Sequence, residues 1–410
     1  MQTLWDECKN CFNEGSDLWN YYNISFGNPF GNNQASINFI KDFFKAGGKE
    51  IAIEMDWMDT EVKRRSTHSI YVYFLGLLLY RAIGEKLEIK SEYGANYDFS
   101  YLWYIVCLAH DYGYEYEVKQ ISEIELDSWC RYYLNYLENN IKSANCELKR
   151  FGLFRPNRDL FYKFMGFDIT GYDTCETTRM LMMNGGNQYT RKQLGLSEYI
   201  EYTNGLKVRS SIYTKEIKNQ YFQYRLYRFN CIDHGIIGAD KLYNGLVKNY
   251  CSKFKQCQEP VDFNNFVFNN LHFCVEQFKI FRYISDCIAS HNIWYASDIS
   301  SKRFYINFGL NSLLYKKNRK ISYEKNPLFF LLCLADSLEP VKRGNESDAQ
   351  QILEQIKIDY CQISKIVKII IRSNWSNSEC GKQYIRNVKG LTTWLDIKIE
   401  CINWETGAVI

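Results

Sequence analysis

Three short, almost wholly apolar segments limit what this chain can fold into. They are STHSIYVYFLGLLLYRAIG (66–84), DFSYLWYIVCLAH (98–110) and NPLFFLLCLADSLEPVKR (326–343). A helix drawn through any of them has apolar residues on every side, which indicates helices buried in a core rather than lying on a surface. Each apolar run is shorter than the roughly 18 residues that a membrane span needs. The chain is therefore predicted to be mostly α-helical, without a membrane span.

The first of these segments is expected to form a helix that begins at a Ser66 or Thr67 cap and ends at Gly84. This places His68 in the first turn of the helix. A shorter helix is predicted from Leu4 to Phe12. Helical periodicity is also present in segments 233–251, with Asp233 as the expected N-cap, and 265–294.

The pattern changes in two other regions. Gly, Thr, Asn and Tyr dominate much of 150–229, where LKVRSSIYT (206–214) alternates as a strand does, so we predict an insertion of loops and strands. The C-terminal segment is expected to begin with a helical run over 349–371, and the alternation in 391–405 predicts a short pair of strands. The predicted domains are a lead-in (1–65), a helical domain carrying the insertion (66–347) and a C-terminal segment (348–410).

Composition narrows the class of protein. With 46% hydrophobic and 24% charged residues the chain is typical of globular proteins, and a net charge of +3 does not favour stable binding to duplex nucleic acid. The 15 cysteines and the acidic residues Asp6 and Glu7, where a secretory leader would be apolar, indicate reduced thiols and a cytoplasmic location. No phosphate-binding GxxxxGK[ST] motif occurs.

Only five histidines occur, and four of them stand at the start or end of a predicted core helix. These four are His68, His110, His234 and His291, and Asp336 stands likewise near the end of an apolar helix. Mn²⁺, Fe²⁺, Co²⁺ and Zn²⁺ accept imidazole nitrogen together with carboxylate oxygen, and packed helices can bring such ligands to one cavity. The pattern predicts a buried metal site. His272 has no such neighbours and is interpreted as structural.

The order His, His-Asp, His, His, Asp resembles that of the HD-domain phosphohydrolase superfamily. This resemblance implies a helical HD-domain bundle with one or two divalent ions (Mn²⁺, Fe²⁺, Co²⁺, Mg²⁺ or Zn²⁺). It implies that His68, His110, Asp111 and Asp336 hold one ion. His234 and His291 resemble the ligands of a second ion, with Asp111 bridging, so that the two ions activate a water for attack on phosphorus. The implied catalytic residues are Asp111, His234 and His291. Glu115 and Glu117, just past His110 and Asp111 in the sequence, are candidates for a catalytic role in proton transfer.

Two branches of the superfamily are resembled locally. RRSTHSI (64–70) resembles the R-x-THS sequence of deoxynucleoside triphosphate triphosphohydrolases, the dGTPase-like enzymes. This implies a dNTP substrate cleaved to nucleoside and triphosphate, a nucleotide effector, a homo-oligomer, and nucleotide depletion during phage infection as an antiviral role. Those enzymes usually carry more histidines just after the His-Asp doublet, which is His110 and Asp111 here, whereas this chain has YGYEYE at that place.

DHGIIGADKL, ASHNIW and LADSLEPVKR resemble the dinuclear enzymes that cleave dinucleoside tetraphosphates. Hydrolysis of a dinucleoside polyphosphate or a cyclic nucleotide is therefore an alternative activity. A non-catalytic HD module that senses a nucleotide is an alternative of another class.

Several further side chains are candidates for contacts with a substrate. The basic residues Arg64, Arg65, Lys241 and Arg343 are placed in sequence to bind substrate phosphates, and Lys342 is placed like Arg343. Tyr112, Tyr114 and Tyr116 are candidates for stacking on a nucleobase. Cys8 and Cys11 form a lone CxxC, which is a weak zinc signal.

Overall fold

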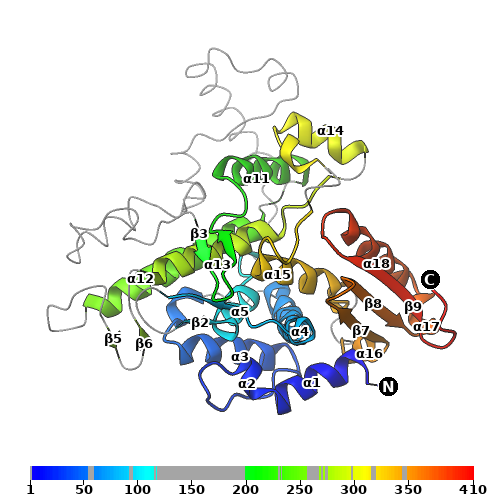
Figure 1. The fold of residues 1–410 in the computed structure, drawn as a ribbon, viewed down its shortest axis with the longest axis horizontal. Helices are drawn as coiled ribbons and strands as arrows, with labels where there is room; N and C mark the ends of the chain where they lie inside the picture. Colours follow the sequence, from blue (N-terminus) through cyan, green and yellow to red (C-terminus); the bar gives the residue numbers. More distant parts are fainter. Residues whose placement is uncertain are drawn as a thin grey trace.

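The computed structural model describes most of the chain outside residues 118–198. The described residues are 2–53, 60–91, 96–114, 117, 199–229, 231, 233–255, 267–268, 271–272, 276–296, 299–314, 320–343 and 349–410. Within these ranges the fold is mostly helical, as predicted (Figure 1). Glu115, Tyr116 and the part of the predicted insertion before residue 199 lie outside them.

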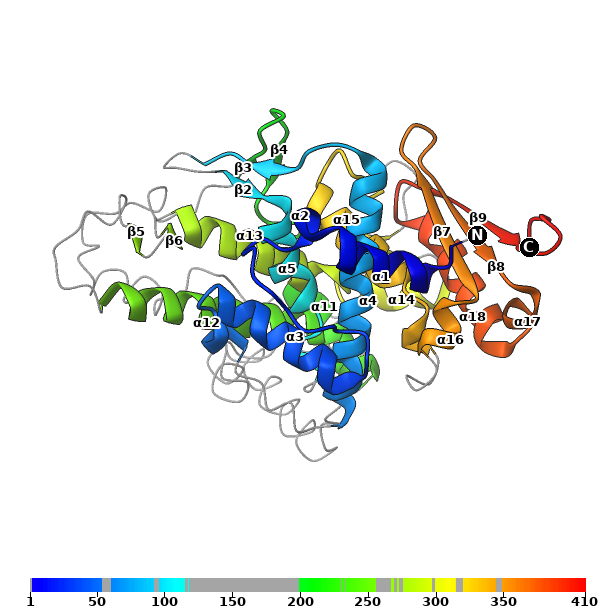
Figure 2. The ribbon, with the colours of Figure 1, turned by 90° about the horizontal axis from the view of Figure 1, so that it is seen from below.

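Five helices form the centre of the fold. They are α4 (Thr60–Ile83), α5 (Phe99–Leu108), α12 (His234–Lys255), α13 (Glu276–His291) and α15 (Pro327–Leu338). Helix α4 packs on α5 and α15, and α13 packs on α5, α12 and α15, as the views in Figures 1 and 2 show. Every residue of α15 is buried, as its almost wholly apolar sequence predicts. These helices bring distant parts of the sequence together.

The N-terminal helices pack into the same core. They are α1 (Leu4–Glu14), α2 (Ser16–Trp19), α3 (Asn33–Ala46) and the 3-10 helix η1 (Glu50–Ile53). Thr3 caps α1 and Asn32 caps α3, while α1 and α3 both pack on α4 (Figure 2). The predicted helix Leu4 to Phe12 is thus confirmed by α1. One cluster of buried apolar side chains extends from Leu4 to Cys401.

Helix α4 begins earlier than predicted. It starts at Thr60 rather than at a Ser66 or Thr67 cap, so His68 lies in the third turn and not in the first. The Ser66 hydroxyl instead donates to the carbonyl of Asn33 at 3.3 Å, and the Thr67 hydroxyl bonds the Asn33 side chain. Both hydroxyls therefore tie α4 to α3 instead of capping a helix. The predicted end at Gly84 is correct, with a φ of +73°.

One short hairpin precedes α5 in the sequence, and a second hairpin and a further helix precede α12. Strands β1 (Glu88–Ile89) and β2 (Tyr97–Asp98) pair antiparallel, as do β3 (Tyr199–Glu201) and β4 (Lys207–Arg209). The strand predicted in 206–214 is thus β4. Helix α11 (Lys215–Phe229) was not predicted, because its sequence KEIKNQYFQYRLYRF lacks a clear apolar stripe.

The segment predicted as one helix over 265–294 has two parts. Strands β5 (Val267–Phe268) and β6 (Leu271–His272) pair, and α13 begins only at Glu276. Its partner α12 has the predicted cap, because an Asp233 carboxylate oxygen accepts from the amide of Ile236 at 3.0 Å. Helix α14 (Ile299–Asn307) and the 3-10 helix η3 (Asn311–Leu313) follow.

The C-terminal region is a small sheet with helices, and the prediction that 349–371 is helical is wrong beyond its start. Helix α16 (Ala349–Leu353) is short, and β7 (Ile356–Cys361) and β8 (Ile366–Ile371) form an antiparallel hairpin. Strand β9 (Lys398–Asn403), in the segment predicted to alternate, pairs parallel with β8. The remaining elements are η4 (Val341–Arg343), α17 (Ser373–Ser376), α18 (Glu379–Gly390) and η6 (Leu391–Thr393).

The sheet attaches to the helical core through α18 and β7. Helix α18 packs on β9 and on α15, while β7 packs on α4 (Figure 1). The Tyr384 hydroxyl of α18 donates to the carbonyl of Leu338 at the end of α15 at 2.8 Å. Across the described ranges, no helix combines the length and apolar character that crossing a membrane requires.

Candidate metal centre

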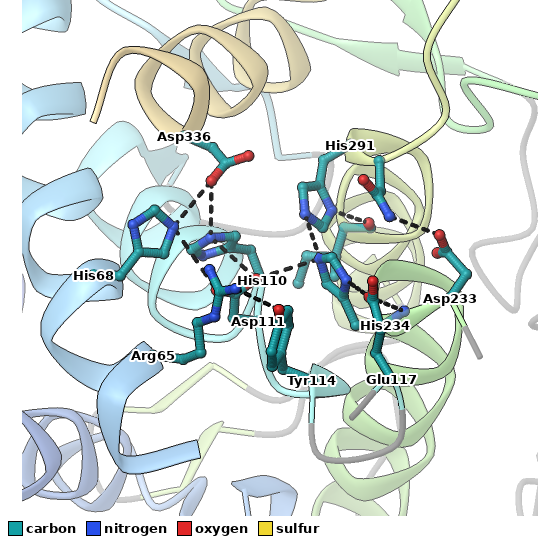
Figure 3. A network of polar contacts seen from close by, with 12 residues as sticks. Arg65, His68, His110, Asp111, Tyr114, Glu117, Asp233, His234, His291 and Asp336 are labelled. Carbon is teal, nitrogen blue, oxygen red and sulfur yellow. Dashed lines mark hydrogen bonds and ion pairs between the residues drawn. The ribbon is translucent and has the colours of Figure 1, made fainter. Parts of the chain in front are cut away.

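The six predicted metal ligands meet in one buried place, although they come from five parts of the chain. His68 lies in α4, His110 and Asp111 in the turn after α5, His234 at the start of α12, His291 at the end of α13, and Asp336 in the last turn of α15 (Figure 3). All six side chains are buried. The helices described above therefore serve to bring scarce polar side chains into an apolar core.

His68, His110 and Asp336 form what we call the first ligand group. Nε2 of His68 lies 3.0 Å from Oδ1 of Asp336, and Nε2 of His110 lies 3.6 Å from the same oxygen. One ligand atom from each residue lies within 4.8 Å of the others, so this group can hold a metal ion. His110, Asp111 and His291 satisfy the same criterion.

Asp111, His234 and His291 form the second ligand group. Nε2 of His234 lies 3.2 Å from Nε2 of His291 and 3.3 Å from Oδ1 of Asp111. The other Asp111 oxygen, Oδ2, lies 3.7 Å from Nε2 of His68 in the first group. One oxygen of Asp111 thus faces each group, which is the arrangement a bridging carboxylate needs.

Two of the histidines are held by the helix that each one ends. Nδ1 of His110 bonds the carbonyl of Cys107 at 2.6 Å, and Nδ1 of His291 bonds the carbonyl of Ile288 at 2.6 Å. The last carbonyls of a helix have no partner within the helix, and a ring N–H three residues on can satisfy one of them. A histidine at a helix end can therefore be held by the backbone of that helix. This hydrogen bond also leaves Nε2 directed at the centre.

Carboxylates hold the other two histidines. Nδ1 of His68 bonds Oε2 of Glu339 at 2.6 Å, and Nδ1 of His234 bonds Oε2 of Glu117. Metal-binding histidines commonly donate their second ring N–H to a carboxylate or a carbonyl, which fixes the tautomer and the ring direction. All four histidines follow this rule, and all four present Nε2 to the same space (Figure 3).

The polar atoms that face this space fit a metal ion. Among the residues that the structure describes, Nε2 of His110 and both carboxylate oxygens of Asp111 are buried without a hydrogen-bond partner. A buried carboxylate left in this way is costly unless a cation or hydrogen bonds compensate it. A set of four imidazoles and two carboxylates suits Mn²⁺, Fe²⁺, Co²⁺ or Zn²⁺ better than the oxygen-preferring Mg²⁺.

The surroundings of Asp336, Asp111 and His291 favour the forms of these side chains that bind a metal. Burial alone would raise the pKa of Asp336, but Lys342 and the adjacent histidines lower it well below its usual range. Burial would also raise the pKa of Asp111, which His110 and Arg65 lower instead. Burial and the neighbouring His234 lower the pKa of His291 to about 3, so its ring is neutral at pH 7.

Two of the predicted cations lie beside the centre. Arg65 Nη1 lies 3.9 Å from Oδ2 of Asp111, and Lys342 Nζ lies 2.8 Å from Oδ1 of Asp336. The Arg65 side chain is 19% exposed and that of Lys342 is 25% exposed, so both reach from the buried carboxylates toward solvent. Arg64 and Arg343 lie in α4 and η4, with side chains outside the description, and Lys241 is partly buried on α12.

Tyr114 holds Arg65 in place. The Arg65 guanidinium carbon lies 3.8 Å from the centre of the Tyr114 ring, and its Nη2 donates to the Tyr114 hydroxyl. This ring face is therefore covered by Arg65, so it is not a free surface for a nucleobase. Tyr112 is partly buried against the core. The sequence motif R-R-S-T-H thus has a structural partner in the loop after the doublet.

Gly113 lets that loop touch α12. A Cβ at Gly113 would lie 2.1 Å from the His234 carbonyl oxygen and 2.6 Å from the Gly238 amide nitrogen. Gly238 is equally close to Gly113, so backbone meets backbone. This contact sets the distance between Asp111 and His234, two residues that come from separate helices.

The sequence interpretation missed Glu339, Arg225 and Asn292. Glu339 lies one helical turn after Asp336, and this spacing on the last turn of an apolar helix is the signal that could have identified it. Its carboxylate also accepts from the amides of Val341 and Lys342, at 2.7 and 3.0 Å. Arg225 pairs with Glu117 and Asn292 donates to Asp233, beside the second ligand group, and no pattern in the sequence indicated either residue.

The other candidate residues lie elsewhere. Cys8 and Cys11 are buried in α1, where burial raises the pKa of Cys11 to about 11. Neither belongs to a metal-ligand group among the described residues. His272 lies in β6, and its side chain lies outside the description.

Comparison with protein-family models, curated proteins and solved structures gave no match. The geometry of the centre and the order of its ligands in the sequence therefore carry the functional argument.

Proposed function

We propose that this protein is a metal-dependent phosphohydrolase of the HD-domain type that acts on a nucleotide. The observation that carries the proposal is the common orientation of four histidines. Each has Nδ1 bonded to a carboxylate or a carbonyl and Nε2 directed at Asp111 and Asp336. A purely structural cluster of buried histidines has no need to leave these atoms facing one another.

The residues around the centre suit a phosphate substrate. A divalent ion bound there would supply Lewis-acid stabilisation of phosphate charge and lower the pKa of a water molecule. Arg65 and Lys342 stand at the partly exposed side and keep N–H donors beyond those used on Asp111 and Asp336, so both can bind phosphate oxygens. Glu117 and Glu339 fix the ring direction of His234 and His68. Asp111 links the two ligand groups.

A deoxynucleoside triphosphate is the proposed substrate, cleaved to nucleoside and triphosphate. The support is the resemblance of residues 64–70 to the R-x-THS sequence, together with the placement of Arg65, three residues before His68, beside the bridging carboxylate. A nucleotide effector and a homo-oligomer belong to the same proposal. Cleavage of a dinucleoside polyphosphate at this centre would use the same residues.

The test is a screen of the purified chain loaded with Mn²⁺ against each dNTP, singly and in mixtures, with products separated by chromatography. We expect equal amounts of nucleoside and triphosphate, and no product after treatment with EDTA. Release of a nucleoside diphosphate or monophosphate would replace the dNTP assignment with the dinucleoside or cyclic nucleotide activity. Nucleotide binding without turnover of any nucleotide, with either Mn²⁺ or Fe²⁺, would overturn the enzyme proposal.

A further inference from the structure

One face of α11 carries a row of polar side chains that contact α13 and the residues next to the second ligand group. Lys218, Tyr221 and Arg225 are spaced by three and four residues, which places them on the same side of a helix. All three make contacts with residues of α13, with the loop that follows it, or with the residues before α12. This row is the polar face that connects α11 to the metal centre.

The first two members of the row tie α11 to α13 and to its C-terminal end. Lys218 forms an ion pair with Asp286 of α13, and both side chains are buried. The Tyr221 hydroxyl donates to the carbonyl of Asn292 at 2.6 Å. Asn292 directly follows the ligand His291, so Tyr221 holds the backbone at the point where that ligand leaves its helix.

Arg225 reaches the residues that orient His234. Its Nη2 pairs with Oε1 of Glu117, whose other oxygen bonds Nδ1 of His234. Its Nε lies 3.4 Å from Oδ2 of Asp233, the cap of α12, which also accepts from the Asn292 side chain at 2.7 Å. Arg225 therefore contacts Glu117, the partner of His234, and is linked through Asp233 to Asn292, the neighbour of His291.

The charges make this arrangement sensitive to Arg225. Asp233 is fully buried and the Glu117 side chain is only 17% exposed, so two carboxylates lie close together away from water. Removing one partner of a buried charge network typically costs several kcal/mol, because the remaining charge is left without compensation. Without the guanidinium, Glu117 and Asp233 would repel each other, and Glu117 could leave His234.

We propose that Arg225 is a positioning residue for the second ligand group, through which α11 controls occupancy of a second metal position independently of the first. The inference rests on the proposed function only in taking the centre to bind two ions. It makes α11, which is the C-terminal end of the predicted insertion, the part of the chain that governs whether the centre holds one ion or two.

The experiment compares wild-type chain with Arg225→Gln, Arg225→Lys and the control Arg228→Gln. Arg228 lies on the same helix but is exposed, against the rings of Phe229 and Phe304. Mn²⁺ binding is titrated by equilibrium dialysis with elemental analysis, and circular dichroism of the metal-free chains reports folding. Arg225→Gln should weaken one of two ions by about 10- to 100-fold and leave the other unchanged. Arg225→Lys should restore part of the loss, and Arg228→Gln should bind as wild type does.

Two further variants assign the affected ion and guard against misfolding. Glu117→Gln keeps the shape of the side chain and should weaken the same ion as Arg225→Gln, whereas Glu339→Gln should weaken the other ion. Equal weakening of both ions by Arg225→Gln, or no weakening, would overturn the inference, as would a wild-type chain that binds one ion. If Arg225→Gln fails to fold, the Glu117→Gln result decides in the same way. A wild-type chain that binds no ion would instead refute the proposed function.

Discussion

The two ligand groups have the same internal plan but different supports. Each group includes one histidine held by a helix carbonyl and one held by a carboxylate. The two groups differ in what holds the carboxylate that orients the histidine. Glu339 accepts backbone amides from residues two and three positions further along the chain. Glu117 is held by the side chain of Arg225, from a helix more than 100 residues away in sequence.

This difference indicates which ligand group can lose its geometry while the other group keeps its own. The support of the first group is local, because α15 and η4 supply Asp336, Glu339 and Lys342 within a few residues. The support of the second group depends on tertiary packing of α11. A change that loosens α11 should therefore affect the second group first, while the first group keeps its geometry.

Asp111→Asn should have the largest effect, because it changes the one carboxylate that faces both ligand groups. One Asp111 oxygen faces each group, and an amide offers neither the charge nor two equivalent oxygens. We expect affinity for both ions to fall by more than about 100-fold, beyond the loss typical of a residue behind the ligands, and hydrolysis to be abolished. Asp359→Asn, on the partly exposed surface of β7, is the control. Retention of two tightly bound ions would contradict the bridging assignment.

Glu339→Gln should have a smaller effect, confined to the first group. The amide oxygen can still accept from the amide of Val341, as Oε1 does. The NH2 group then takes the place of Oε2, which accepts from Lys342 and bonds His68, and the charge that His68 faces is lost. Affinity for one ion should fall by about 10- to 100-fold, measured by metal titration. Glu379→Gln, an exposed change on α18, should have no effect. Weakening of both ions would show that the two groups are not independent.

Glu7→Gln should have the smallest effect and serves as a comparison from outside the centre. Burial raises the pKa of Glu7 to about 7, whereas His234 and Arg225 overcome burial and lower the pKa of Glu117 to about 2. Since the unfolded chain ionises Glu7 near pH 4.5, the folded wild type loses stability as the pH rises from 4.5 to about 7.

The Gln variant escapes this loss, so its advantage should grow over the same range and reach about 1 kcal/mol, a value reduced for partial exposure to water. Urea unfolding in EDTA across pH 4.5 to 8 measures the difference. Glu14→Gln, an exposed change on the same helix, should show no such trend. An advantage that is constant with pH would mean that the carboxyl of Glu7 is not shielded from water.

The apolar core helices and the six candidate ligands could be predicted from the sequence because both leave local signals. The runs 98–110 and 326–343 are apolar on every side, and a histidine or aspartate at the end of such a run has no packing reason to be there. Helix ends also need partners for their last carbonyls, which His110 and His291 provide. Local physics thus placed the ligands at the positions where the sequence showed them.

The supports of the ligands left weaker signals. His68 and Glu339 are 271 residues apart, and Arg225 lies in a helix whose polar sequence gave no stripe to recognise. The hairpin of β7 and β8 was misread for another reason. The helical start of 349–371 was extended through Ile356–Cys361, where alternate burial from Ile356 to Asp359 and β-branched residues favour a strand. Lys365, with φ of +52°, then turns the chain.

Because Gly113 and Gly238 have no side chains, the loop after α5 and helix α12 touch through their backbones, and this contact fixes the distance between Asp111 and His234. Packing between ordinary residues can adjust when one of them grows, because rotamers shift and neighbours give way. Two main chains in direct contact have no such tolerance. Even one added methyl group would push α12 away from His110 and Asp111, and so separate Asp111 from His234. The distance between Asp111 and His234 therefore depends on two residues that have no side chain.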